Sequence, residues 1–102
     1  MDCTLQACGP NVVVHVEGLE DAGELSAQLH VAGEDPLEMW CPDNTECVLD
    51  VPDIHPSSFS VSIEAGDTTH SRSFTPTYRT HYPNGAECGP RCRQAEVTFT
   101  VE

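Results

Sequence analysis

This sequence has no lysine, and its four basic residues are all arginine, against seventeen aspartates and glutamates. The formal net charge of −13 disfavours binding to nucleic acids and to anionic lipid surfaces, because both reward lysine and arginine. No apolar run approaches the ~20 residues that a membrane-spanning helix needs. With 102 residues the chain fits one domain, residues 1–102, and is too short for a large catalytic scaffold such as a TIM barrel.

Motifs that carry catalysis are also missing. None of the seven serines lies in a G-x-S-x-G motif, and the cysteine spacings include no CxxC of the thiol oxidoreductases. A domain of this size and class has no deep pocket by default. The sequence therefore predicts no catalytic residue, no cofactor and no enzyme.

Metal-ligand motifs are equally scarce. The five histidines form no H-x-H or H-E-x-x-H unit. His15 and His30 occupy the polar faces of two predicted strands and could be cross-strand neighbours, but two ligands would make only a weak zinc or copper site. We expect solvated surface histidines and no metal site.

Acidic residues in loops are the candidates for calcium. They fall in or beside predicted loops, although the EF-hand pattern is absent. The groups are Glu20–Asp21, Glu34–Asp35, Asp43–Glu46 and the pair Asp50 and Asp53. The favoured interpretation is a solvated acidic surface that keeps the protein soluble.

The cysteines are the strongest positive signal. Six of them stand in three close pairs, which is typical of disulfides formed in an oxidising compartment. The pairs are Cys3 and Cys8, Cys41 and Cys47, and Cys88 and Cys92. The Pro-Asp-Asn turn predicts a Cys41–Cys47 bridge. For the other four, two patterns stay open: local pairing, or bridges from the first pair to the last.

The hydrophobic pattern predicts an all-β fold. Short segments rich in β-branched residues or with alternating polarity recur at regular spacing, without a convincing helix. The predicted strands cover 11–17, 25–31, 37–41, 46–51, 59–64, 69–74, 77–82 and 93–101, with Pro76 marking an edge or a bulge. This indicates an immunoglobulin-like or transthyretin-like β-sandwich of seven to eight strands with disulfides.

Two sets of side chains are candidates for partner binding. Trp40, Tyr78 and Tyr82 could form a binding spot, since aromatics often anchor interfaces. The favoured role of Trp40, however, is packing in the core against a disulfide. The arginines gather in the last third of the chain and could present the only positive surface, although ordinary local ion pairs are the simpler expectation: Arg72, Arg79, Arg91 and Arg93.

The two ends of the chain carry a resemblance. The opening Cys3-Thr-Leu-Gln-Ala-Cys8 and the stretch Pro83-Asn-Gly-Ala-Glu-Cys-Gly-Pro-Arg-Cys-Arg-Gln-Ala95 resemble a group of uncharacterised bacterial exported proteins that look like lipoproteins. The resemblance implies export and a sandwich fold, and it brings no catalytic residues. Met1-Asp2 is no lipobox, so we expect the export signal to lie upstream in the native precursor.

These observations favour a non-enzymatic domain of the bacterial envelope or the extracellular space. It would act as a binding or structural module for a protein or another envelope component, and it could be lipid-anchored in the precursor. One alternative is a small secreted protease inhibitor that presents the Pro83–Cys92 loop, in which Arg91 suits a trypsin-like pocket. Another alternative is a surface metal-binding protein.

Overall fold

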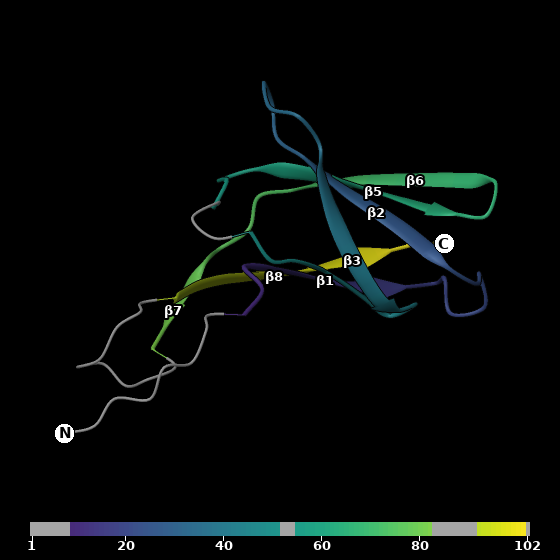
Figure 1. Cartoon of the computed structure of the whole chain (residues 1–102), viewed down its shortest axis with the longest axis horizontal. Coiled ribbons are helices and arrows are strands. Elements are labelled where there is room, and N and C mark those ends of the chain that lie inside the picture. The colour runs from purple at the N-terminus through teal and green to yellow at the C-terminus, as the bar shows by residue number, and fades with distance from the viewer. Residues whose placement is uncertain (1–8, 52–54, 83–91, 102) are drawn as a thin grey trace.

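All regular elements that the computed structural model describes are β-strands (Figure 1). The described residues are 9–51, 55–82 and 92–101. Along the chain the strands are β1 (Val12–Glu17), β2 (Leu25–His30), β3 (Leu37–Asp43), β4 (Glu46–Leu49), β5 (Phe59–Ala65), β6 (Thr68–Phe74), β7 (Arg79–His81) and β8 (Cys92–Thr100). The predicted strands agree with these bounds to within two residues, and the all-β prediction is confirmed. No described segment is a helix long and apolar enough to cross a membrane.

The strands form one curled, mixed sheet in the order β6-β5-β2-β3-β4-β1-β8-β7. β1 and β8 run parallel, and the other neighbours are antiparallel. The first half of β3 pairs with β2 through Leu37 and Met39, and its second half pairs with β4 through Trp40 and Asp43. Figure 1 shows β3 passing from the layer of β2, β5 and β6 to the layer of β1 and β8.

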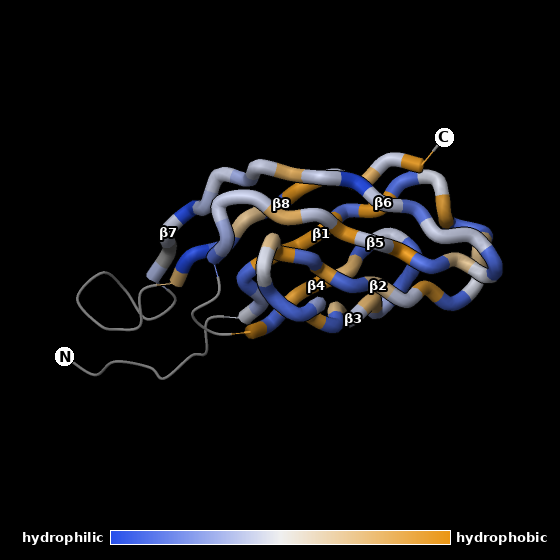
Figure 2. Tube along the Cα trace, turned by 90° about the horizontal axis from the view of Figure 1, so that it is seen from above, coloured by the Kyte–Doolittle hydropathy of each residue, from blue (hydrophilic) through white to orange (hydrophobic). Residues whose placement is uncertain are grey.

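The curl buries one face of the sheet. Val14 of β1 and Val61 of β5 belong to the same buried cluster, although their strands are not neighbours. Phe74 of β6 lies 6.2 Å from Phe99 of β8, measured between ring centres. Figure 2 shows hydrophobic and hydrophilic residues alternating along these strands. The period of two therefore gives each strand an apolar side, and the twist of the sheet brings those sides together.

The alternation also decides where Trp40 lies. Its neighbour Met39 points to the core, so Trp40 points outward and 69% of it is exposed. The prediction that Trp40 packs in the core is therefore wrong. The same alternation is regular in β1, β2 and β5, where Val12, Leu29 and Ile63 are all fully buried.

One predicted disulfide lies within the described residues. Cys41 of β3 is bonded to Cys47 of β4, with the two Cα atoms 4.0 Å apart. Cys47 is completely buried, so the bridge ties the β3–β4 hairpin to the core. Cys92, at the start of β8, is disulfide-bonded as well. The predictions for Cys3, Cys8 and Cys88 fall outside the described residues.

Candidate binding surface

His15 and His30 lie on separate parts of the sheet. His15 pairs with Glu46 and Thr98 on β1's two neighbours, whereas His30 pairs with Ser60 of β5. The expectation that His15 and His30 could be cross-strand neighbours is therefore wrong, because β3 and β4 separate their strands. No group of three or more histidine, cysteine or acidic side chains placed to hold a metal occurs in the described parts of the chain.

Two of the four acidic groups proposed for calcium come together. Glu20, Asp21, Glu24 and Asp43 line one wide hollow of about 510 Å³. The Asp43 carboxylate accepts hydrogen bonds from the backbone N–H and the hydroxyl of Thr45, at 2.8 and 2.6 Å. These bonds lower the pKa of Asp43 below its ordinary value. The Asp43 carboxylate thus stabilises the β3–β4 turn. The hollow itself is an open acidic surface.

The remaining acidic groups lie elsewhere. Glu34 and Asp35 occupy the turn between β2 and β3, at the opposite end of these strands from Asp43. Asp50 follows β4, also at the far end of that strand, and Asp53 falls outside the described residues. The four loops therefore do not build a common calcium site.

A serine and a histidine meet on the outer face of β2 and β5. Ser62 Oγ lies 3.0 Å from His30 Nε2. A catalytic set would also need a carboxylate on the second ring nitrogen and an oxyanion site in a pocket. Within the described residues no carboxylate hydrogen-bonds His30, and the pair stands on a sheet face. The pair thus links β2 and β5 across the outer face of the sheet.

The aromatic residues near β7 form their own cluster. The Tyr78 hydroxyl donates a hydrogen bond to the Pro56 carbonyl at 2.9 Å, and the Arg93 guanidinium lies 5.3 Å from the ring centre. Burial raises the pKa of Tyr78 above its ordinary value, and the charge of Arg93 opposes part of this rise. Because β4, β1 and β8 separate β3 from β7, Trp40 and Tyr78 do not share one binding spot.

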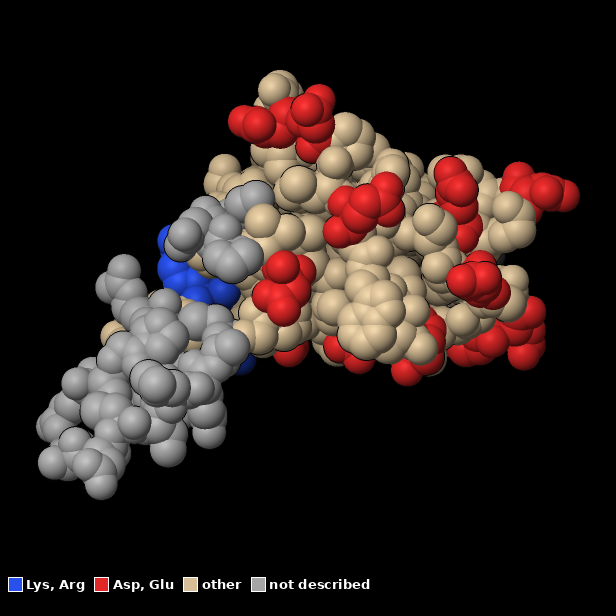
Figure 3. All heavy atoms as spheres, viewed as in Figure 1, with Lys and Arg blue, Asp and Glu red and all other residues tan. Residues whose placement is uncertain are grey.

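The arginines make ring and carbonyl contacts. Arg72 lies 5.5 Å from the centre of the Phe99 ring and donates to the Thr100 carbonyl at 3.4 Å. In the described part of the chain, His15 Nε2 lies 3.7 Å from the Glu96 carboxylate, and no arginine lies within ion-pair distance of a described carboxylate. On the face drawn in Figure 3, the basic side chains gather at the β7 end, and acidic side chains are scattered over the rest.

A row of three apolar side chains crosses the outer face of the sheet. Trp40 pairs with Val48 across β3 and β4, and Val48 pairs with Val13 across β4 and β1. Val13 is only 6% exposed although it lies outside the main core cluster. The three side chains make a row whose β3 end is an exposed indole. Such an indole presents a large flat surface for a partner.

Hollows border this indole on both sides. One of them, about 400 Å³, includes Trp40, Val48 and three carboxylates. Its described lining residues, which we call the Trp40 platform, are Pro10, Glu38, Trp40, Pro42, Glu46, Val48, Asp50 and Val51. The other, about 490 Å³, includes Trp40 together with Glu24 and Glu64. Among the residues that the structure describes, no arginine lines either hollow. The platform is therefore apolar at its centre and negative at its rim.

The sequence indicated only part of this surface. The exposed position of Trp40 could have been read from its place beside the inward Met39, but the cross-strand row needs the register of β3, β4 and β1. The Pro83–Cys92 loop of the inhibitor hypothesis falls outside the described residues, apart from Cys92. No protein-family model, curated protein or solved structure matches this chain.

Proposed function

We propose that this protein is a non-enzymatic, exported binding module that recognises its partner through the Trp40 platform. The observation that carries the proposal is the indole of Trp40, which is 69% exposed and has a hollow on either side. Tryptophan is among the residues most enriched at binding hot spots, and it offers a large rigid contact surface.

Export is the second part of the proposal. The Cys41–Cys47 bridge and the bonded state of Cys92 support it, since disulfides persist in oxidising compartments. The resemblance of the chain ends to bacterial envelope lipoproteins points the same way. Fractionation of the source cells tests this part: a cytoplasmic protein with alkylatable thiols would contradict it.

We also propose that the curled sheet is a β-sandwich of immunoglobulin-like or transthyretin-like type. Support comes from the buried cluster that β1 and β5 share and from the contact between Phe74 and Phe99. An experimental structure decides this part, because a sandwich has two facing layers about 10 Å apart.

Nuclear magnetic resonance tests the binding role, because the chain contains a single tryptophan. The Trp40 indole N–H gives one resolved signal that can be followed during titration with three probes: an oligoarginine peptide, an oligoglutamate peptide and a neutral chito-oligosaccharide. At least one probe should shift this signal, and Trp40→Ala should weaken the binding of that probe about tenfold or more, as measured on backbone amide signals. The proposal fails if no probe shifts the indole signal, or if Trp40→Ala leaves the Kd of the binding probe unchanged.

A further inference from the structure

We infer that the Trp40 platform binds a basic peptide segment of a partner protein, rich in arginine or lysine. This inference rests on the proposed function and names the chemical class of the partner. Three properties of the described surface carry it: the aromatic centre, the acidic rim, and the lack of basic side chains around both hollows.

The aromatic centre suits a cation. The face of an indole is the best aromatic acceptor for ammonium and guanidinium groups, and arginine also stacks on it through its planar fork. The exposed indole of Trp40 lies beside Val48, which is half-buried and offers an apolar contact for the aliphatic stem of a long basic side chain.

The acidic rim makes the site selective for positive charge. On one side of Trp40, the hollow is lined by three carboxylates, Glu38, Glu46 and Asp50. On the other side, Glu24 and Glu64 line the second hollow. The Glu38 carboxylate also accepts a hydrogen bond from the side-chain amide of Gln28 at 3.0 Å, which orients it. Because one group of carboxylates lies on each side of the indole, both groups attract a cation that approaches the ring.

A peptide fits this layout better than a single small cation. The two acidic groups flank the indole on a sheet face, and an extended peptide presents successive side chains along a line. A segment with basic residues on both sides of the indole would contact both groups together. A neutral oligosaccharide can also stack on an exposed indole, but it gains no Coulomb energy from the carboxylates.

The experiment measures binding of a fluorescently labelled oligoarginine peptide by anisotropy, which does not depend on the tryptophan as reporter. Binding should weaken steeply as salt concentration rises, because the exposed charges are screened. Trp40→Ala should raise Kd about tenfold, and Trp40→Phe should raise it less, since the indole is the stronger cation acceptor.

A charge-matched pair of triple variants separates a site from general attraction. The platform variant carries Glu38→Gln, Glu46→Gln and Asp50→Asn, and the control variant carries Asp21→Asn, Glu34→Gln and Asp35→Asn. Both remove three negative charges. The platform variant should raise Kd at least about tenfold, whereas the control should change it less than about threefold. Equal losses in the two variants would overturn the inference.

The other probes distinguish this inference from the proposed function. If the chito-oligosaccharide or oligoglutamate peptide shifts the Trp40 signal and oligoarginine does not, the platform remains a binding site and the basic-peptide inference is wrong. If the protein associates with itself and Trp40→Ala abolishes this, the occupant is a second copy and the inference is again wrong. If no probe binds, both proposals fail.

Discussion

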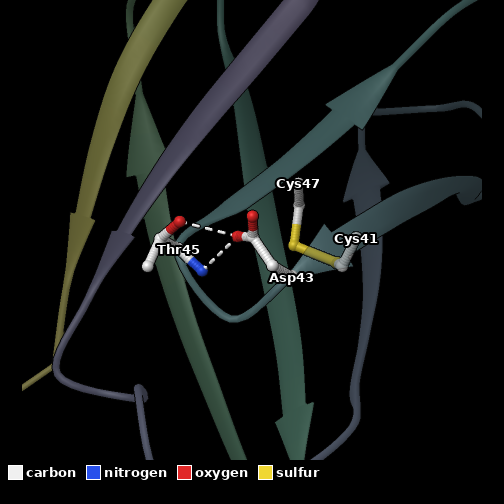
Figure 4. The surroundings of a disulfide bond; sticks show 4 residues. All are labelled: Cys41, Asp43, Thr45 and Cys47. Carbon is white, nitrogen blue, oxygen red and sulfur yellow. Dashed lines mark hydrogen bonds between the residues drawn. A yellow bond between two sulfur atoms is a disulfide. The ribbon is translucent and has the colours of Figure 1, made fainter.

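The carboxylate of Asp43 accepts two hydrogen bonds from Thr45, one from its backbone N–H at 2.8 Å and one from its hydroxyl at 2.6 Å. Both residues lie inside the loop that the Cys41–Cys47 disulfide closes (Figure 4). An aspartate that hydrogen-bonds the backbone two residues further on stabilises a tight turn. The β3–β4 hairpin that carries Trp40 is therefore held by a covalent and a polar constraint together.

The first prediction concerns the pH dependence of this turn. The hydrogen bonds lower the pKa of Asp43 in the folded protein, so the ionised form stabilises the fold. This contribution is present above the unfolded-state pKa, about 3.9, and is lost as the pH falls through the lower folded-state pKa. Asp43→Asn should thus lower Tm slightly at neutral pH, and the difference from wild type should shrink in acid. Asp35→Asn, in an exposed turn, is the control; a pH-independent difference would contradict the argument.

The second prediction concerns the disulfide. The bridge closes a short loop with a sequence separation of 6, for which the chain-entropy relation gives about 2 kcal/mol. Replacing Cys41 and Cys47 together by alanine should lower the free energy of unfolding by at least this amount, because Cys47 also fills the core. Urea denaturation measures it. A double variant as stable as wild type would show that the bridge has no role in stability.

The third prediction concerns Gly18, between β1 and β2. Its φ is +100°, and a Cβ at this position would collide with the carbonyl oxygen of Val101. Gly33 has φ +81°, but a Cβ there would meet nothing. Gly33→Ala should cost about 1–2 kcal/mol for the left-handed backbone, and Gly18→Ala should cost clearly more because the close approach adds to it. Equal melting temperatures for the two variants would mean that Gly18 does not lie close to the carbonyl oxygen of Val101.

The fourth prediction compares two phenylalanines that face each other across the curl. Phe99 is completely buried, whereas Phe74 is half-buried at the edge strand β6. Phe99→Ala should destabilise by about 3–5 kcal/mol, and Phe74→Ala by less. Because their rings are in contact at 6.2 Å, the double variant should lose less than the sum of the two losses. Strict additivity would indicate that β6 and β8 do not pack together.

The fifth prediction tests the outward position of Trp40. An exposed side chain contributes little packing, so Trp40→Ala should change the free energy of unfolding by no more than about 0.5 kcal/mol. A tryptophan in the core would instead cost about 3–5 kcal/mol. The wild-type protein should also fluoresce like tryptophan in water and be quenched readily by acrylamide. Shielded emission in the free protein would place Trp40 in the interior.

Much of the fold followed from the sequence. The period of two in segments such as Phe59–Ala65 marks an inward and an outward face whatever the topology, because it is a property of the extended backbone. The Cys41–Cys47 bridge was also predictable, since its turn residues and close spacing are local. For the same reason, the short turn between β3 and β4 could be read from Pro and Asn positions. Pro76 lies in no strand: it falls in the connection between β6 and β7, which stand at opposite ends of the strand order.

Only the tertiary structure decided the rest. The parallel pairing of β1 with β8 joins residues at opposite ends of the chain, and it left His15 and His30 apart. The register that aligns Trp40, Val48 and Val13 likewise comes from three strands. Local pattern thus determined which side each residue takes, and long-range pairing determined which residues share a surface.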